Sequence, residues 1–235
     1  MHQVFTHPGS CTITLGGHEL HLRPDKTVWW PARRTLLVAD LHLGKVTAFA
    51  AGGVPIDPKI GLLAAGRDLA LLANAVSSTG AERIIILGDL IHAKGSRDAK
   101  LLGHVAAWRG TISETEILLI RGNHDSKAGD PPASWIMTVC DEGRDEHGLV
   151  LLHVPRSHRT CTPQGAPAVC GHVHPVVTLG DLPGCGGQRE RVACFVRTNN
   201  ELILPAFGSF TGGGRVSPAA DTRLYLIAGS RVMAV

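Results

Sequence analysis

The sequence predicts an α/β fold in which a parallel sheet, formed by the first half of the chain, packs against a second sheet formed by the other half. Two patterns support this fold class. Apolar, strand-like runs alternate with helical periodicity up to residue 120, and short apolar runs separated by glycine and proline follow from residue 149. The first pattern is typical of parallel strands joined by crossover helices, and the second of strands joined by turns.

The first half begins with antiparallel strands around the Gly16-Gly17 turn. A long helix is predicted to start at Asp57, beside Pro58, because apolar residues then recur at helical spacing until Gly80. The expected elements, in order, are strands at 12–15, 19–22, 27–30 and 36–39, a helix at 57–80, a strand at 83–87, a helix at 98–108 and a strand at 116–120.

The second half lacks helical periodicity and predicts short strands only. They are expected at 149–152, 168–170, 176–179, 192–196, 202–204, 224–227 and 231–235. With 235 residues and 24.9 kDa, the chain is expected to form a single domain, 1–235. Three stretches rich in turn-forming residues, at 126–134, 155–167 and 180–187, are expected to surround a site.

Composition and charge are those of an ordinary soluble protein. A net charge of +3 is too small to indicate a polyanionic partner, and an aromatic content of 4% leaves few rings on which nucleic acid bases could stack. No apolar stretch approaches the ~18 residues of a membrane span, and the first ten residues lack a signal-peptide pattern. We therefore expect a cytoplasmic protein with reduced cysteines, with a conditional Cys185–Cys194 disulfide as the alternative.

Five polar clusters, each directly after an apolar run, are the strongest functional signal. They are Asp40-Leu41-His42, Gly88-Asp89, Gly122-Asn123-His124-Asp125, His153 and Gly171-His172-Val173-His174. Buried strands that end in carboxylates, imidazoles and an amide predict a metal site at the strand ends. Each cluster alone is common as a strand-end turn or as a hydrogen-bonded core histidine. The presence of all five clusters in this order predicts that they contribute to one site.

The number of candidate ligands is too large for one metal ion. The seven side chains are Asp40, His42, Asp89, Asn123, His153, His172 and His174. With Asp89 as a charged bridge they divide into two groups of four, and two cations roughly 3.5 to 4 Å apart can hold a phosphoryl oxygen and activate a shared water. Nitrogen and oxygen donors without thiolate suit manganese, iron, zinc or similar ions. His124, next to a ligand, remains free for proton chemistry.

The order of these clusters resembles the calcineurin-like metallophosphoesterase superfamily, whose motifs run Asp-x-His, Gly-Asp, Gly-Asn-His-Asp/Glu, His and Gly-His-x-His. The resemblance covers residues 40–174 and implies a four-layer αββα sandwich of two mixed β-sheets flanked by helices. It also implies that one ion is held by Asp40, His42, Asp89 and His174, and the other by Asp89, Asn123, His153 and His172. His124 takes the family's catalytic histidine role.

A narrower resemblance covers most of the chain. The segments 40–45 (DLHLGK), 172–175 (HVHP) and 204–213 (LPAFGSFTGG) are similar to those of the bacterial DNA-ligase-associated metallophosphoesterases. That subfamily is named for an endonuclease role in the DNA damage response, beside an ATP-dependent ligase, a helicase and an exonuclease. The resemblance implies a phosphodiester substrate, DNA according to the subfamily's name, and these functional partners.

The chain departs from the protein Ser/Thr phosphatases, which extend Gly-Asp to Gly-Asp-x-x-Asp-Arg-Gly. Here the stretch is Gly88-Asp89-Leu90-Ile91-His92-Ala93-Lys94, which disfavours that activity. The partner that orients His124 is left open, with Asp125 either in that role or holding the loop. His92 and Lys94 either face a bound phosphate or are solvated.

The sequence therefore predicts a hydrolase with two divalent ions, Mn²⁺ or else iron, zinc or another divalent metal. A metal-bridging hydroxide is expected to attack phosphorus in line, while His124 donates a proton to the leaving oxygen. DNA or a nucleotide-like diester is the expected substrate. The alternatives are a phosphomonoesterase or nucleotide pyrophosphatase that acts on a small metabolite, and a non-catalytic scaffold in a repair complex.

Overall fold

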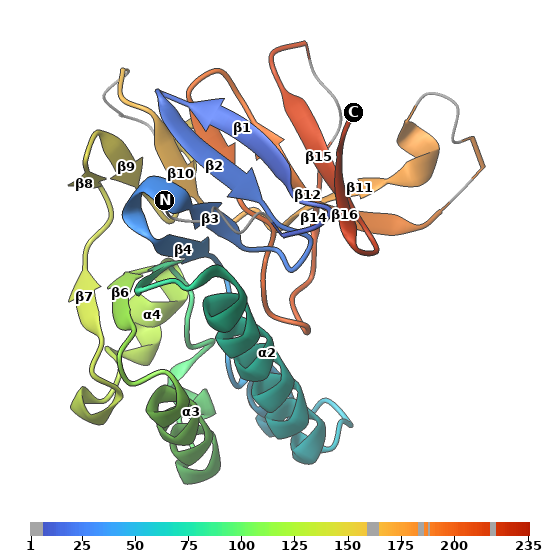
Figure 1. Cartoon of the computed structure of the whole chain (residues 1–235). Helices are drawn as coiled ribbons and strands as arrows, with labels where there is room; N and C mark the ends of the chain where they lie inside the picture. Colours follow the sequence, from blue (N-terminus) through green and yellow to red (C-terminus); the bar gives the residue numbers. More distant parts are fainter. Residues whose placement is uncertain (1–6, 159–164, 183–185, 188, 217–219) are drawn as a thin grey trace.

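Two mixed β-sheets pack face to face in the computed structural model, which describes residues 7–158, 165–182, 186–187, 189–216 and 220–235 (Figure 1). The helices α2, α3 and α4 lie on one side of the first sheet, and the second sheet lies on its other side (Figure 1). The α/β fold with two mixed sheets and flanking helices confirms the predicted fold class.

The first sheet contains seven strands in the described part of the chain, and their spatial order follows the sequence. They are β1 (Cys11–Leu15), β2 (His18–Leu22), β3 (Val28–Trp30), β4 (Thr35–Val38), β5 (Arg83–Leu87), β6 (Glu116–Ile120) and β7 (Thr138–Cys140). β1, β2 and β3 pair antiparallel, as predicted; β3 and β4 also pair antiparallel, and β4 to β7 pair parallel. Val38 lies opposite Ile86 and Leu87 opposite Ile120, so β4, β5 and β6 end at the same edge.

The second sheet has the spatial order β14-β11-β12-β13-β10-β9-β8, with β15 paired to β12 and β16 paired to β15. Its described strands are β8 (Arg144–Glu146), β9 (Leu149–Leu151), β10 (Ala168–Cys170), β11 (Pro175–Thr178), β12 (Arg191–Arg197), β13 (Glu201–Ile203), β14 (Gly214–Arg215), β15 (Arg223–Ala228) and β16 (Arg231–Ala234). β9 and β10 are parallel neighbours, with Ala168 opposite Val150. These two strands therefore also end side by side.

The described α-helices belong to the first half of the chain. They are α1 (Lys45–Ala51), α2 (Pro58–Thr79), α3 (Ala99–Thr111) and α4 (Asn123–Ala128). α2 starts where predicted because the Asp57 carboxylate accepts a hydrogen bond from the Lys59 N–H at 2.9 Å, and Gly80 ends it in a left-handed conformation. Asp98 caps α3 in the same way through the N–H groups of Lys100 and Leu101.

Alternate side chains of the parallel strands point to opposite faces of the first sheet and pack into two separate hydrophobic cores. Leu36 and Ile84 face α2 and α3 on the outer side of the first sheet, whereas Leu37 and Ile85 face the second sheet. Because both faces are covered, these strands read as continuous apolar runs rather than as an alternating pattern. A third apolar cluster, which includes Leu182, is formed by strands of the second sheet and residues that adjoin them.

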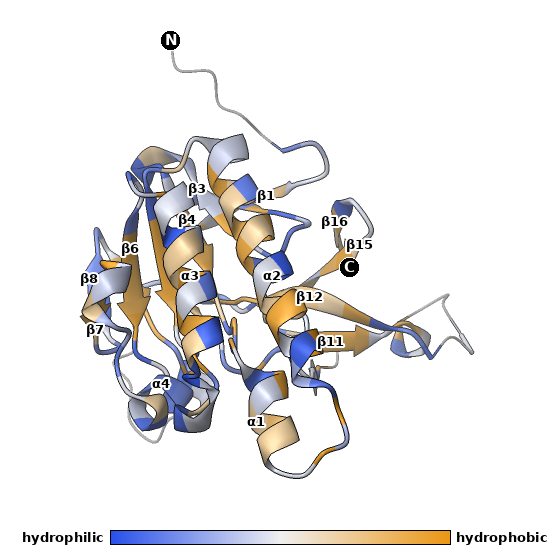
Figure 2. Cartoon of the chain, turned by 90° about the horizontal axis from the view of Figure 1, so that it is seen from below, coloured by the Kyte–Doolittle hydropathy of each residue, from blue (hydrophilic) through white to orange (hydrophobic). Residues whose placement is uncertain are grey.

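Among the described residues, one helix, α2, has the length and the apolar composition that would let a helix cross a membrane. Its mean hydropathy is 1.3. Leu69, Leu72 and Ala75 of this helix are buried in the core that covers the first sheet. Figure 2 shows α2 beside α3, with the apolar strands of the first sheet behind them. We therefore identify α2 as a partly buried core helix.

Five short elements were not predicted from the sequence, namely α1, α4, β7, β8 and β14. The three strands have two or three residues each, which is too short for any periodicity. α1 starts after a left-handed Gly44 without a side-chain cap, and α4 begins inside a polar cluster. Cys194 carries a free thiol, and Cys185, its alternative partner, lies outside the described residues.

A buried carboxylate ties the segment 204–213 to α2. Asp68 is 4% exposed, and it accepts hydrogen bonds from the Ser209 backbone N–H at 2.9 Å and from the Ser209 hydroxyl. The adjacent N–H groups of Phe207 and Gly208 donate to the carbonyls of Ala39 and Asp40, at 2.9 and 3.1 Å. This segment therefore connects α2 to the loop after β4.

We predict that Asp68→Ala lowers the free energy of unfolding by about 1.5–3 kcal/mol, because hydrogen bonds to a charged group contribute about that much. Ser209→Ala removes only the hydroxyl bond and should cost about 1 kcal/mol. Urea denaturation of the two variants and the parent measures both values. Equal losses in the two variants would mean that the bond to the backbone N–H contributes nothing to stability.

Candidate metal centre

All five polar clusters lie directly after parallel strands. Asp40 and His42 follow β4, Asp89 follows β5, and Asn123 follows β6. From the second sheet, His153 follows β9, and His172 and His174 follow β10. The carboxyl ends of these strands meet at one edge of the two-sheet core, so segments far apart in the sequence contribute to one site.

The backbone at this edge adopts a conformation that is uncommon outside glycine. Nine non-glycine residues of the described chain have positive φ, and five of them are predicted ligands, namely Asp40, His42, Asp89, His172 and His174. Their φ values lie between 47° and 70°. Such strain costs of order 1–3 kcal/mol per residue and concentrates at functional sites.

Two glycines of the clusters let the ligand side chains approach the backbone. A Cβ atom on Gly88 would overlap the imidazole of His153, and Gly88 also has φ +85°. A Cβ atom on Gly122 would overlap the Asp89 carboxylate. Glycine is therefore required at positions 88 and 122, because any larger residue would clash with the ligand side chain that lies against the backbone there.

One group of side chains gathers Asp40, His42 and His174 around one oxygen of Asp89. The Nε2 atoms of His42 and His174 are 3.2 Å apart, and His174 Nε2 is 3.3 Å from Asp40 Oδ1. His42 Nε2 is 3.6 Å from Asp89 Oδ2. These ring nitrogens and carboxylate oxygens all face one small volume, as the ligands of a cation do.

A second group gathers Asn123, His153 and His172 around the other oxygen of Asp89. His153 Nε2 is 3.5 Å from Asp89 Oδ1 and 2.9 Å from Asn123 Oδ1. His172 Nδ1 is 3.1 Å from His153 Nε2. The structure thus brings all seven predicted side chains together in the two predicted groups.

Backbone carbonyls fix the orientation of two of these imidazoles. His153 Nδ1 is 2.9 Å from the carbonyl of Leu87, and His174 Nδ1 is 3.0 Å from the carbonyl of Gly212. An Nδ1–H that donates to a carbonyl leaves the Nε2 lone pair directed into the site.

The Asp40 carboxyl group gives an independent test of whether these residues fit a metal ion. It is fully buried, and its Oδ2 accepts the His172 N–H at 2.8 Å, while its Oδ1 makes no well-formed hydrogen bond within the described residues and has the His174 ring nitrogen 3.3 Å away. A buried carboxylate oxygen that is poorly satisfied is costly, and a cation held between it and the imidazole removes that cost. Burial, followed by the nearby His174 and His124, lowers the pKa of His42 to about 2, so this imidazole is neutral and its lone pair is free. The donor set therefore fits a metal ion.

His124, the predicted catalytic residue, lies at the edge of the site with its side chain 31% exposed. Its Nε2 is 4.0 Å from Asp89 Oδ2, and its Nδ1 is 2.6 Å from the carbonyl of His92. The His92 ring stacks on the His124 ring, with centroids 4.6 Å apart. The backbone carbonyl of His92 is thus the group that orients His124, a question the sequence left open.

Asp125 has the loop-holding role rather than the orienting one. Its buried carboxylate accepts hydrogen bonds from the N–H groups of Asp89 (2.7 Å), Gly122 (3.0 Å) and Ile91 (3.1 Å). It therefore joins the loop after β5 to the loop after β6. Burial raises the pKa of Asp125, and its three N–H donors oppose that shift.

The structure separates the other residues that the sequence singled out. His92 is part of the site, with its Nδ1 3.3 Å from His42 Nδ1, whereas Lys94 is exposed in a 3-10 turn. His158 stands at the rim, with its ring 6.5 Å from that of His172. The stretches 155–167 and 180–187 lie partly outside the described residues.

Sequence reasoning missed two side chains near the site. Lys45 lies at the start of α1; burial is the largest cause that lowers the pKa of His42 and His92, and the nearby ammonium group of Lys45 adds to it. Phe210 lines a small cavity together with His42 and Lys45. Both residues lie within segments that carried the narrower resemblance, 40–45 and 204–213, but nothing in the sequence placed Phe210 beside Lys45.

Among the comparisons with known proteins, the one with solved structures found a match. No protein-family model and no curated protein matched the chain. The crystal structure of Pseudomonas putida nuclease MPE is similar over 96% of this chain and 100% of that chain, with 39% sequence identity and a TM-score of 0.77.

Identity at this level over nearly the whole length shows common ancestry, not only a shared fold. The clusters of histidine and aspartate at the strand ends supply the metal-binding groups that such an enzyme needs. The resemblance inferred from the sequence is confirmed: the chain belongs to the calcineurin-like metallophosphoesterase superfamily, among the bacterial DNA-ligase-associated members, and is a metal-binding hydrolase of phosphoric esters.

Proposed function

We propose that the chain is a two-metal phosphodiesterase that cleaves DNA or nucleotide-like diesters. The observation that carries this proposal is the position of Asp89, whose Oδ2 lies 3.6 Å from His42 Nε2 and whose Oδ1 lies 3.5 Å from His153 Nε2. One carboxylate thus faces both groups of ligands, as a bridging ligand does. A DNA substrate is supported by the relative, which is named a nuclease.

In this proposal each ion has four protein ligands. One is held by Asp40, His42, Asp89 and His174, and the other by Asp89, Asn123, His153 and His172. Nitrogen and oxygen donors of this kind suit Mn²⁺. When bound, two such ions clamp the phosphoryl group, lower the pKa of a shared water and stabilise the charge that develops during in-line displacement.

We assign the role of proton donor to His124. Its ring is held by the carbonyl of His92 at 2.6 Å, which leaves Nε2 directed toward the site. We propose that Nε2 donates a proton to the leaving oxygen, which converts a poor alkoxide leaving group into an alcohol. The partial exposure of the side chain lets a large substrate reach this atom.

A groove beside His174 supports an extended substrate rather than a small metabolite. This cavity of about 150 Å³ is lined by Lys26, Arg191 and the glycines that follow Phe210. Its two cationic side chains suit phosphates that flank the one being cut. The subfamily resemblance adds an ATP-dependent DNA ligase, a helicase and an exonuclease as proposed functional partners in the cytoplasm.

The substrate class is tested with manganese-loaded protein. We expect hydrolysis of bis-nitrophenyl phosphate and of DNA to be faster than hydrolysis of nitrophenyl phosphate at equal enzyme concentration, because the proposed site acts on phosphodiesters and the flanking groove adds contacts to a DNA strand. Initial rates on the three substrates measure this. Faster turnover of the monoester would favour the small-metabolite phosphomonoesterase, and hydrolysis of none of them would contradict the proposal.

Asp89→Asn is expected to weaken both metal sites at once, because it removes the one charge that the two groups share. The metal content of purified protein, measured by mass spectrometry, should fall from two manganese ions per chain to fewer than one. Asp130→Asn, which changes an exposed carboxylate paired with Arg121, is the matched control and should retain both ions. Two tightly held ions in Asp89→Asn would show that the bridge is another residue.

His124→Ala should reduce the turnover of DNA by roughly 10²- to 10⁴-fold while both manganese ions stay bound. The loss should be much smaller for bis-nitrophenyl phosphate, because nitrophenolate leaves readily without a proton. Steady-state rates on both substrates and metal analysis measure these effects, with His158→Ala as a rim control. Equal losses on the two substrates would refute the proton-donor role, and loss of both ions would make His124 a ligand.

A further inference from the structure

Two phenylalanine rings stand out because they are exposed at the metal centre. Of the phenylalanine, tyrosine and tryptophan side chains in the described residues, the four tryptophans, Tyr225, Phe195 and Phe207 are all buried. Phe49 and Phe210 are 45% and 43% exposed. Single exposed apolar side chains are common, but two exposed aromatic rings beside one site, in a chain that buries its other described rings, mark a place of ligand contact.

Phe49 lies on the side of the site that carries His124. It belongs to α1, and its ring meets the His92 ring edge to face at 5.8 Å. His92 in turn stacks on His124. The three rings form a row that leads from the exposed face of Phe49 to the proposed proton donor.

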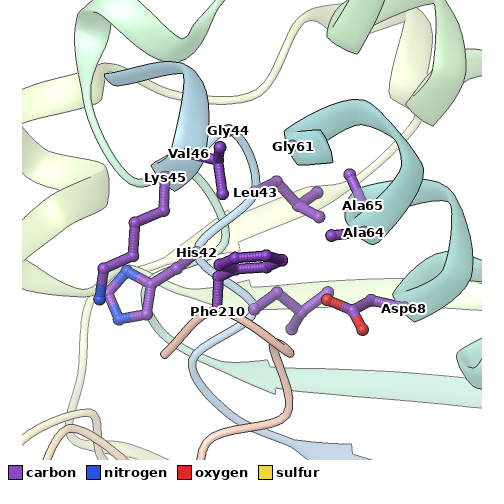
Figure 3. Close-up of a pocket in the computed structure, with 11 residues that line it drawn as sticks. His42, Leu43, Gly44, Lys45, Val46, Gly61, Ala64, Ala65, Asp68 and Phe210 are labelled. Carbon is purple, nitrogen blue, oxygen red and sulfur yellow. The ribbon is translucent and has the colours of Figure 1, made fainter. Parts of the chain in front are cut away.

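Phe210 lies on the side of the site that carries His42. Both residues line the same small cavity, and Figure 3 shows the Phe210 ring between the His42 imidazole and the start of α2. The backbone just before it is fixed, because the N–H groups of Gly208 and Ser209 donate to Asp40 and Asp68. The ring is therefore held at the rim by a rigid segment.

The cationic side chain of Lys45 lies near both rings. Lys45 Nζ is 5.8 Å from the centroid of the Phe49 ring, and Lys45 also lines the cavity of Phe210 (Figure 3). An ammonium group beside two exposed rings matches a nucleotide, which presents a phosphate next to an aromatic base. Proteins that hold unpaired strands combine these same two groups.

We propose that Phe49 and Phe210 each stack on a nucleobase next to the scissile phosphate, with Lys45 contacting the phosphate backbone. This inference rests on the proposed function and names how that site recognises its substrate. Hydrolysis itself needs neither ring, whereas every nucleobase has an aromatic face that can stack on one. Recognition by stacking is therefore independent of base sequence. A docking surface for another protein is the competing explanation of the two rings.

The test compares two single strands of equal length, one of thymidine and one in which tetrahydrofuran residues replace every nucleoside. The readout is the ratio of kcat/KM on the base-bearing strand to that on the base-free strand, with manganese-loaded protein. Phe49→Ala and Phe210→Ala should each lower this ratio at least fivefold, since removal of one stacking ring costs roughly 5- to 150-fold. Leu63→Ala, which removes an exposed apolar side chain from α2, is the control and should leave the ratio unchanged.

Further substitutions separate ring stacking from apolar contact. Phe49→Trp and Phe210→Trp should keep the ratio of the parent, whereas leucine at either position should lower it as alanine does. An unchanged ratio in both alanine variants overturns the inference, leaves the proposed function intact and favours the docking surface. Failure of the parent to cleave either strand would overturn the proposed function and this inference with it.

Discussion

The geometry of the site depends on one buried carboxylate that bonds only to backbone N–H groups in the described residues. Asp125 accepts hydrogen bonds from the backbone N–H groups of Asp89, Ile91 and Gly122, and so holds the loops after β5 and β6 against each other. Asp89 in turn accepts the N–H of His124 at 2.9 Å. The residue shared by the two ligand groups and the proposed proton donor are thus fixed by a single set of charge-assisted bonds. Neutral partners would hold these loops less firmly.

The rest of the fold supplies the rigidity that the strained loops require. Five predicted ligands have left-handed backbone conformations, at a cost of order 1–3 kcal/mol each. Such strain persists only where the surroundings determine the conformation, and here each of these loops follows a strand whose last three residues are fully buried. Leu37, Ile85 and Leu118 from the first sheet and Leu151 and Val169 from the second sheet are all 0% exposed in the core between the sheets. Packing of that core therefore holds the ligands in place before any metal binds.

The sequence predicted the long elements and the positions of the clusters because both leave a pattern in the residue types. Fully buried strands read as apolar runs, and the long helix has Asp57 and Gly80 at its ends. The partner of His124 left no such pattern, because it is a main-chain carbonyl that any residue at position 92 could supply. Phe210 was missed for another reason: its proximity to His42 arises from tertiary packing across more than 160 residues of sequence.

The small net charge of the chain is compatible with a polyanionic substrate once the metal ions are counted. Burial lowers the pKa of His42 and of His172, and the acidic side chains of the two groups are Asp40 and Asp89. Two divalent cations would exceed the charge of two carboxylates and give the site a net positive charge, to which Lys45 adds. The attraction for phosphate is then concentrated at the reacting centre rather than spread over the surface. Composition gives only the net charge of the side chains. That charge does not include metal ions bound where the strands end.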